Sequence, residues 1–84
     1  MKDWYVYILR CRDGTLYTGV TVDLRKRLDA HQRGVAAKYT RSRGPVTLVY
    51  EETQPDRSRA LAREAALRRI GRAGKLALIA SAST

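Results

Sequence analysis

The alternation of hydrophobic and polar residues predicts β-strands in the first part of the chain. Residues 4–11 (WYVYILRC) are β-branched and aromatic, residues 12–14 (RDG) have turn composition, and residues 15–20 (TLYTGV) return to a strand pattern. Together these segments have the signature of a β-hairpin. Residues 46–52 (VTLVYEE) predict a third strand.

Helical periodicity begins after the hairpin. Residues 23–33 predict an amphipathic helix, with Asp23 as its N-cap and Gly34 as its stop. Residues 35–45 (VAAKYTRSRGP) are basic and end in Gly-Pro, so we expect a loop there.

The last third of the chain is rich in alanine and arginine and predicts further helices. Pro55 and Asp56 open a helix that reaches about residue 70. Gly71 and Gly74 bracket a break, and residues 75–80 (KLALIA) predict a short last helix. The element order β-β-α-β-α-α therefore predicts a three-stranded sheet covered by helices.

Two registers are open to the hairpin. A two-residue turn at 13–14 would place Tyr7 and Tyr17 on opposite faces of the sheet, because side chains alternate along a strand. A three-residue loop at 12–14 would place the two tyrosines on one face, with Gly19 opposite Tyr7. The second register gathers Tyr5, Tyr7 and Tyr17 together, but the residues alone do not choose between the two.

The inner stripe of the 23–33 helix is unusual. It consists of Leu24, Arg27, Leu28 and His31, so that two ionisable residues stand where a core helix carries apolar ones. A fully buried, unpaired arginine is too costly, and we expect both to line a cleft beside the core. Alternatively, Arg27 extends its head to solvent and His31 is a hydrogen-bonded core residue.

Length and charge narrow the classes of function. The 84 residues predict one small domain over residues 1–80, with a disordered tail at 81–84. The net charge is +9, with +3 in residues 1–56 and +6 in residues 57–84. Such an excess favours a polyanionic partner, most simply nucleic acid.

The sequence also bears on cellular setting. It shows no stretch apolar enough to span a membrane and no signal-peptide layout at its start, and no helix combines a basic face with a large aromatic one. Its single cysteine, Cys11, has no partner within the chain and is expected to be a small buried hydrophobe. We expect a cytoplasmic protein without a membrane partner, as a monomer or weak homodimer.

Two short motifs lie on the hairpin, Tyr5-Val6-Tyr7 on its first strand and Tyr17-Thr18-Gly19 on its second, and a helical pattern follows them. Together they resemble the GIY-YIG endonuclease superfamily, in particular its small stand-alone bacterial (YhbQ-like) branch. The helical pattern matches Thr21, Leu24, Arg27, Leu28 and His31, and the later segment DRSRALARE matches the metal-binding helix, with Glu64 in the acidic position. The resemblance covers essentially the whole chain.

This resemblance implies an α/β (α+β) fold with a central three-stranded antiparallel sheet and a single divalent ion, Mg²⁺ or Mn²⁺. By position it implies five catalytic residues, of which Glu64 is also the metal ligand: Tyr7, Tyr17, Arg27, His31 and Glu64. The chain departs from the family pattern at three motif positions and in composition. It has Tyr5 for glycine, Thr18 for isoleucine, Val20 where some members have lysine, and no asparagine at all.

General chemistry gives these residues suitable tasks. Phosphodiester hydrolysis needs an activated water and stabilisation of charge at phosphorus. Mg²⁺ accepts one carboxylate together with water and substrate phosphate, and an arginine fork suits phosphate. Tyr17 is the preferred base, supported or replaced by Tyr7 and His31. Glu64, however, also has Arg68 four residues later and forms an ordinary surface ion pair in the alternative interpretation.

We therefore expect a metal-dependent, shape-selective DNA endonuclease in DNA repair or processing, which leaves 5′-phosphate and 3′-hydroxyl ends as the family implies. A non-catalytic nucleic-acid-binding module with a degenerate site is the alternative, and RNA in place of DNA stays open. The residues expected to contact nucleic acid are Arg25, Lys38, Arg41 and Arg43.

Overall fold

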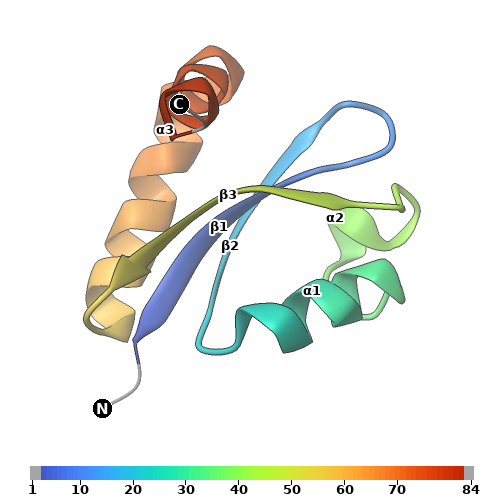
Figure 1. Cartoon of the computed structure of the whole chain (residues 1–84), viewed down its shortest axis with the longest axis horizontal. Coiled ribbons are helices and arrows are strands. Elements are labelled where there is room, and N and C mark those ends of the chain that lie inside the picture. Colours follow the sequence, from blue (N-terminus) through green and yellow to red (C-terminus); the bar gives the residue numbers. More distant parts are fainter. Residues whose placement is uncertain (1–2, 83–84) are drawn as a thin grey trace.

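The computed structural model describes residues 3–82. Three strands, β1 (Trp4–Arg10), β2 (Leu16–Thr21) and β3 (Thr47–Gln54), form an antiparallel sheet in the order β2-β1-β3 (Figure 1). The helices are α1 (Leu24–Gln32), α2 (Lys38–Arg41) and α3 (Arg57–Ala82). The α+β fold expected from the sequence is confirmed. The structure adds one short helix, α2, and α3 consists of two helical segments joined at Gly71. Without α2, the observed order is the predicted β-β-α-β-α-α.

The hairpin adopts the register that brings the tyrosines together. Leu9 pairs with Tyr17 and Tyr7 pairs with Gly19, and the amide of Cys11 donates to the carbonyl of Thr15 at 2.9 Å. The loop therefore consists of residues 12–14, and its glycine has a φ of +85°. The three-residue loop is confirmed.

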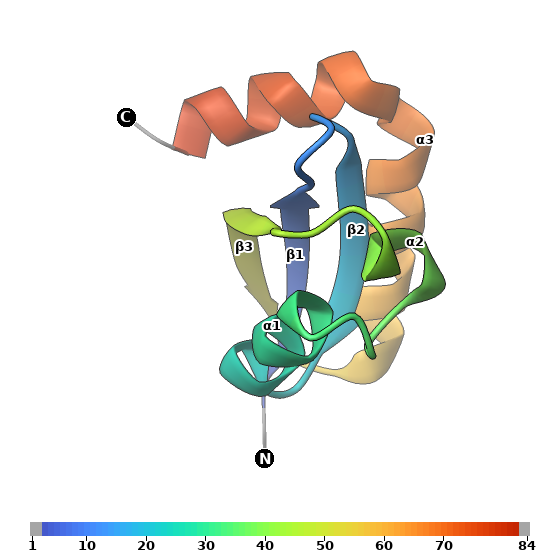
Figure 2. The ribbon, with the colours of Figure 1, turned by 90° about the vertical axis from the view of Figure 1, so that its right-hand side faces the viewer.

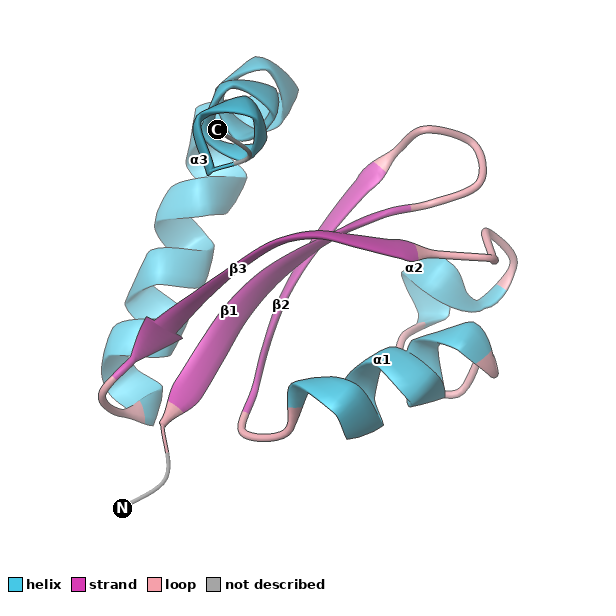
Figure 3. Ribbon diagram, in the orientation of Figure 1, coloured by secondary structure: helices cyan, strands magenta, loops and turns pink. Residues whose placement is uncertain are grey.

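Each face of the sheet carries its own core. On one face, Val6 and Ile8 of β1 pack against Ala60 and Leu67 of α3. On the other face the core is formed by Tyr7, Leu9, Cys11 and Val46, with Leu24 and Leu28 of α1 packed against it. Figures 1 and 3 show α3 on one side of the sheet and α1 with α2 on the other. Cys11 is buried and unbridged, as expected for a small hydrophobe.

Helix α1 begins and ends as its sequence predicts. The carboxylate of Asp23 accepts from the amide of Lys26 at 3.0 Å, and Gly34 follows the helix with a φ of +76°. The side-chain amide of Gln32 bonds to both the N–H and the carbonyl of Val46. This pair of bonds fixes the end of α1 beside the start of β3.

Helix α3 changes direction at Gly71, whose φ of 72° and ψ of −174° are not helical. The segment after Gly71 crosses the end of the sheet toward the hairpin loop (Figure 2), and Arg72 Nη1 donates to the carbonyl of Gly14 at 2.8 Å. The predicted break therefore lies at Gly71 alone, and Gly74 is inside a helix. Only glycine adopts this backbone conformation without strain.

Two boundaries differ from the sequence prediction. The basic segment 35–45, expected to be a loop, contains α2 and the buried Thr40. Helix α3 includes Ser81 and Ala82, which were assigned to a disordered tail, while residues 83–84 lie outside the described part of the chain. Within residues 3–82, no helix has both the length and the apolar character that crossing a lipid bilayer requires.

Candidate active site

The two motif tyrosines lie on either side of Gly19: Tyr7 pairs with it across the hairpin, and Tyr17 precedes it by two residues in β2. A Cβ atom added to Gly19 would lie 2.5 Å from the hydroxyl oxygen of Tyr7 and 2.6 Å from its Cζ, so the ring of Tyr7 lies directly against the glycine backbone. The ring centroids of Tyr7 and Tyr17 are 6.5 Å apart. Glycine in the second motif is therefore required by the close approach of the first motif's tyrosine.

A chain of hydrogen bonds runs from Tyr7 into the protein. The hydroxyl of Tyr7 lies 2.8 Å from His31 Nε2, and His31 Nδ1 lies 2.8 Å from the hydroxyl of Thr40, which donates to the carbonyl of Ala37. The arrangement that gives every proton of this chain an acceptor has His31 Nδ1 donating to Thr40 and Nε2 accepting from Tyr7. All three side chains are buried, with exposed fractions of 2 % or less.

The electrostatics of the site keep both partners of this pair neutral. Burial, and next the neighbouring Tyr17, raise the pKa of Tyr7, whereas Arg27 lowers it and Glu64 raises it. Burial first, and then the charge of Arg27, lower the pKa of His31. The phenol of Tyr7 thus lies within electrostatic reach of three other candidate residues, Tyr17, Arg27 and Glu64.

Tyr17 is the more accessible of the two motif tyrosines. It is half-buried, and its ring centroid lies 5.2 Å from that of His31 and 5.8 Å from that of Tyr39. Tyr7, by contrast, is buried and directs its proton to His31. Of the two, Tyr17 is the one that a water molecule at the surface can reach.

The two ionisable residues of the α1 stripe have separate surroundings. His31 is buried as a hydrogen-bonded core residue, which agrees with the second of its two interpretations and not with the cleft. Arg27 is exposed and lies at the rim of a hollow. This hollow runs along the start of α1 and is lined by Thr21, Val22, Asp23, Lys26, Arg27, Ala30, Val35 and Ala36.

Glu64 reaches the site from α3, on the opposite face of the sheet. Its carboxylate lies 3.2 Å from Arg68 Nη2, and its side chain is only 17 % exposed. Arg68 also donates to the carbonyl of Thr18 in β2 at 3.4 Å. The ion pair of the alternative interpretation is therefore present, with the side chain of Arg68 largely exposed and that of Glu64 shielded beside the edge strand β2.

The donor set suits a hard divalent ion held by one protein ligand. No group of three or more His, Cys, Asp or Glu side chains that would hold a metal occurs within residues 3–82. Glu64 nevertheless offers a partly shielded carboxylate, and Mg²⁺ is commonly bound through one or two carboxylates together with water and substrate phosphate. A single Mg²⁺ or Mn²⁺ ion fits these residues, with Arg68 as its competitor for the carboxylate.

The four residues expected to contact nucleic acid divide into two groups. Arg25, Lys38 and Arg41 are exposed. Arg43 instead forms an ion pair with Asp13 at 3.2 Å, donates to the carbonyl of Tyr39 at 2.7 Å and covers the Tyr39 ring at 4.2 Å. Its guanidinium joins the hairpin loop to α2, so an internal structural role accounts for it.

Some residues of the site carry weak signals in the sequence. Thr40 and Tyr39 lie in a basic segment without periodicity, and nothing in the pattern shows that they contact His31 and Tyr17. The four-residue spacing of Glu64 and Arg68 predicts their ion pair on α3. It does not predict that Arg68 also donates to the backbone carbonyl of Thr18.

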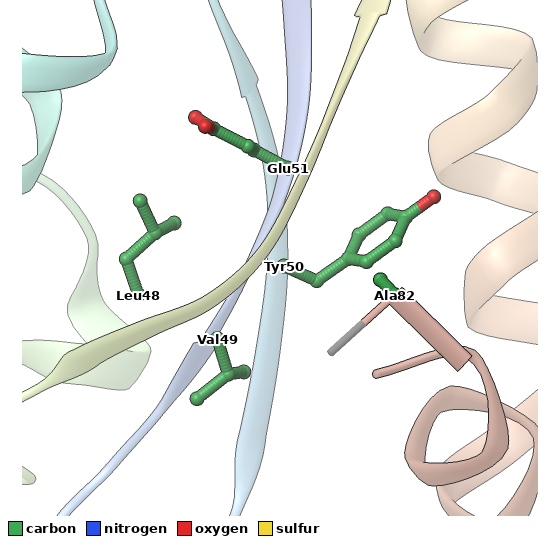
Figure 4. Close-up of a pocket in the computed structure, with 5 residues that line it drawn as sticks. All are labelled: Leu48, Val49, Tyr50, Glu51 and Ala82. Atoms are coloured by element: carbon green, nitrogen blue, oxygen red, sulfur yellow. The ribbon is translucent and has the colours of Figure 1, made fainter. Parts of the chain in front are cut away.

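A separate hollow lies at the other edge of the sheet. It is lined by Leu48, Val49, Tyr50, Glu51 and Ala82, and Figure 4 shows these side chains around β3 and the end of α3. Because β1 separates β3 from β2, this hollow is not part of the site at Gly19. No cationic side chain is among the five residues that line it.

Known proteins match both the sequence and the fold. Residues 3–76 match the model of the GIY-YIG catalytic domain. A UPF0213 protein of Clostridium perfringens is 52% identical over 79 residues, covering 94% of this chain and 85% of that protein, and one of Streptococcus sanguinis is 51% identical over 75 residues, covering 89% and 86%.

A solved structure extends the likeness to three dimensions. The solution structure of a UPF0213 protein from Bacillus halodurans has a TM-score of 0.60 and 41% sequence identity, and the match covers 93% of this chain and 83% of that one. The paired motifs around Gly19, the family-model match and these relatives agree. The chain belongs to the GIY-YIG family of catalytic domains.

Proposed function

We propose that this protein is a metal-dependent endonuclease that hydrolyses phosphodiester bonds of DNA and leaves 5′-phosphate and 3′-hydroxyl ends. The observation that supports this most strongly is the packing of the two motif tyrosines, since the ring of Tyr7 lies against Gly19 and its centroid is 6.5 Å from that of Tyr17. The charges of Arg27 on α1 and of Glu64 on α3 both influence the pKa of Tyr7, so a cation and a carboxylate act on this pair from the two sides of the sheet. Membership of a nuclease superfamily supports the same activity.

Each residue has one task in this proposal. Tyr17 accepts the proton of the attacking water, because it is the motif tyrosine that solvent reaches. Arg27 holds a non-bridging phosphate oxygen with its planar guanidinium and stabilises the charge that develops at phosphorus. Tyr7 and His31 are positioning residues, since their hydrogen bond fixes the hairpin against α1.

Glu64 is the residue that would hold the divalent ion, Mg²⁺ or Mn²⁺. When bound, the ion would polarise the phosphate and assist departure of the 3′ oxygen. Binding would require the carboxylate to be shared with, or released by, Arg68. The chain's own contribution is a carboxylate held near the β2 backbone by α3.

One observation favours a second candidate, a nucleic-acid-binding module without catalysis. The carboxylate of Glu64 is already paired with Arg68 at 3.2 Å, as expected of a site that has lost its metal. The positive surface would serve either function. We rank the endonuclease first because Tyr17, Arg27 and Glu64 are all retained.

Shape-selective cleavage in DNA repair or processing is the role we propose. Arg25, Lys38 and Arg41 are exposed and suited to phosphate, and phosphate contacts carry no sequence information. We therefore expect these contacts to select DNA by shape and not by a long recognition sequence. A cytoplasmic location and a monomer or weak homodimer complete the proposal.

The decisive experiment is incubation of the protein with plain, nicked, flapped and branched DNA, and with RNA, in Mg²⁺, Mn²⁺ or EDTA. We expect cleavage of a subset of the DNA structures in the presence of either ion and none in EDTA. Binding without cleavage under every condition would favour the module. Cleavage that persists in EDTA would rule out the metal-dependent mechanism.

A further inference from the structure

A further hollow lies at the hairpin end of β2. It is lined by Thr15, Leu16, Tyr39, Arg72 and Lys75. The cations come from the segment of α3 after the kink at Gly71, which crosses the end of the sheet (Figure 2). Without that kink the helix would continue in its first direction and would not bring Arg72 to the hairpin loop.

The positive charges around this hollow are poorly neutralised. Arg72 donates to a neutral acceptor, the carbonyl of Gly14. Lys75 lines the same hollow as Arg72, and burial first and then the charge of Arg68 lower the pKa of Lys75. Glu64 is the only acidic residue from Arg57 to the end of the chain, and it is already paired with Arg68. Cations held together in this way are stabilised by an added anion.

This hollow adjoins the candidate active site. Tyr39 lines it, and the ring of Tyr39 lies 5.8 Å from that of Tyr17. The hollow at the opposite end of β2 contains Lys26 and Arg27. Strand β2, with Tyr17 and Gly19, thus lies between two cationic hollows that open at its two ends.

We propose that Arg72 and Lys75 form a second phosphate-binding site, which holds the backbone of the nucleic-acid strand that is cut beside Tyr17. This proposal rests on the function proposed above. It adds the length of nucleic-acid strand that the protein contacts, which we call the footprint. The six residues of β2 span about 20 Å, and one strand of a duplex carries a phosphate about every 3.4 Å of helix axis. The footprint is therefore about six nucleotides on one strand.

The site also gives the footprint a direction. Arg27 holds the scissile phosphate toward one end of β2, and the pair Arg72–Lys75 holds another phosphate of the same strand at the other end. These two anchors keep the cut strand along the β2 edge. A strand end shorter than this span reaches only one anchor. Short single-stranded or flapped ends are thereby distinguished from longer ones by length and not by sequence.

The test measures binding separately from cleavage. Affinity of labelled duplex and single-stranded DNA is measured in EDTA at several salt concentrations for the natural protein and for Arg72→Ala/Lys75→Ala. Loss of two phosphate contacts lowers the slope of log affinity against log salt by about 1.8 for duplex and 1.4 for single strands, or about 60-fold in duplex affinity at 0.1 M salt. Arg57→Ala/Arg59→Ala is the control, with the same charge change at the other end of α3.

Oligonucleotide length supplies the second measurement. Affinity of the natural protein for short hairpin duplexes should rise steeply up to about six base pairs and level off beyond, whereas the double variant levels off earlier. Lys75→Gln preserves the Arg72–Gly14 hydrogen bond, so it separates lost charge from a displaced hairpin loop. It should lower the salt slope by about half as much as the double variant.

The outcomes distinguish this proposal from the function it rests on. If the natural protein binds and cuts DNA while the double variant and its control behave alike, the second phosphate site is wrong and the endonuclease stands. If the natural protein binds no nucleic acid at all, both are wrong. A lower slope in the double variant alone supports the site, whether or not cleavage is observed.

Discussion

The hydroxyl of Tyr7 and Nε2 of His31 share a buried hydrogen bond of 2.8 Å that joins β1 to α1. The hydrogen bonds continue from His31 through the hydroxyl of Thr40 to the carbonyl of Ala37. Neither residue is a free proton acceptor at the surface. Their contribution is to hold the tyrosine face of the hairpin beside the helix that carries Arg27.

The pH dependence of stability should report this pair. The pKa of His31 is lowered in the folded protein, so the unfolded chain binds more protons below its ordinary pKa of about 6.5. Stability is therefore complete above about pH 6.5 and falls as the pH drops below it. Thermal unfolding between pH 5 and 8 should show this decline.

A non-titrating variant provides the comparison. His31→Gln should be less stable at pH 7.5 but nearly independent of pH between 5 and 7. Asp13 and Glu52, whose pKa values are also lowered, lose their contributions only below about pH 4.5. An identical pH slope for both proteins would show that His31 does not titrate as its surroundings require.

Substitution of Gly19 should displace Tyr7. An alanine Cβ would lie 2.5 Å from the tyrosine hydroxyl, which is too close for any contact. We expect Gly19→Ala to lower the free energy of unfolding by about 1–3 kcal/mol, as overpacked cores do. In a Tyr7→Leu background the same change should cost much less. Equal costs in the two backgrounds, measured by urea unfolding, would argue against the proposed contact.

Local rules were sufficient for much of the fold. Asp23 caps the start of α1, and Gly34 ends it with a positive φ. Gly71 marks the kink in α3 by its own positive φ. The sequence predicts these three features because each depends only on residues close by in the chain. The three-residue loop was one of two open registers. The contact of Tyr7 with Gly19 selects it, and that contact becomes visible only when the strands are paired.

The candidate site was less predictable, since its contacts join distant parts of the chain. The sequence leaves two interpretations of His31 open, because its partners, Tyr7 and Thr40, are 24 and 9 residues away. Charge alone predicts that Arg43 contacts nucleic acid, whereas in the fold it pairs with Asp13, 30 residues earlier. Charge and periodicity describe a residue type, but not which partner the fold supplies.

Two buried threonines should respond in opposite directions to removal of their hydroxyls. Thr18 Oγ1 is buried against α3 and finds no hydrogen-bond partner within the described residues, whereas the Thr40 hydroxyl bonds to His31 and Ala37. Thr18→Val should raise the free energy of unfolding by about 1 kcal/mol, and Thr40→Val should lower it by about 1–3 kcal/mol. Chemical denaturation of both variants checks the signs, and a loss of stability in Thr18→Val would contradict the first.

Arg41 and Arg43 should also differ, although the sequence assigned both to nucleic acid. Arg41→Glu leaves the described ion pairs intact and should weaken binding to all DNA sequences alike, with a lower salt slope. Arg43→Ala removes the contacts to Asp13 and Tyr39, so it should lower stability by about 1 kcal/mol. Fluorescence anisotropy measures DNA binding and thermal melting measures stability of both variants. A melting temperature of Arg43→Ala equal to that of the natural protein would argue against the structural role of Arg43.

The role of Glu64 is decided by comparing it with its ion-pair partner. Glu64→Gln retains the shape of the side chain but removes the charge that would hold the cation, so cleavage should fall by about 10²–10³ while DNA binding is kept or improved. Arg68→Ala breaks the same 3.2 Å ion pair but leaves the carboxylate in place. Exposed pairs contribute about 0.3–0.5 kcal/mol, so both variants should fold.

If Glu64 serves the metal, only Glu64→Gln loses cleavage to this extent, and its residual activity should respond less to added Mg²⁺. If Glu64 serves Arg68 alone, the two variants behave alike in every assay, and the binding module becomes the better interpretation.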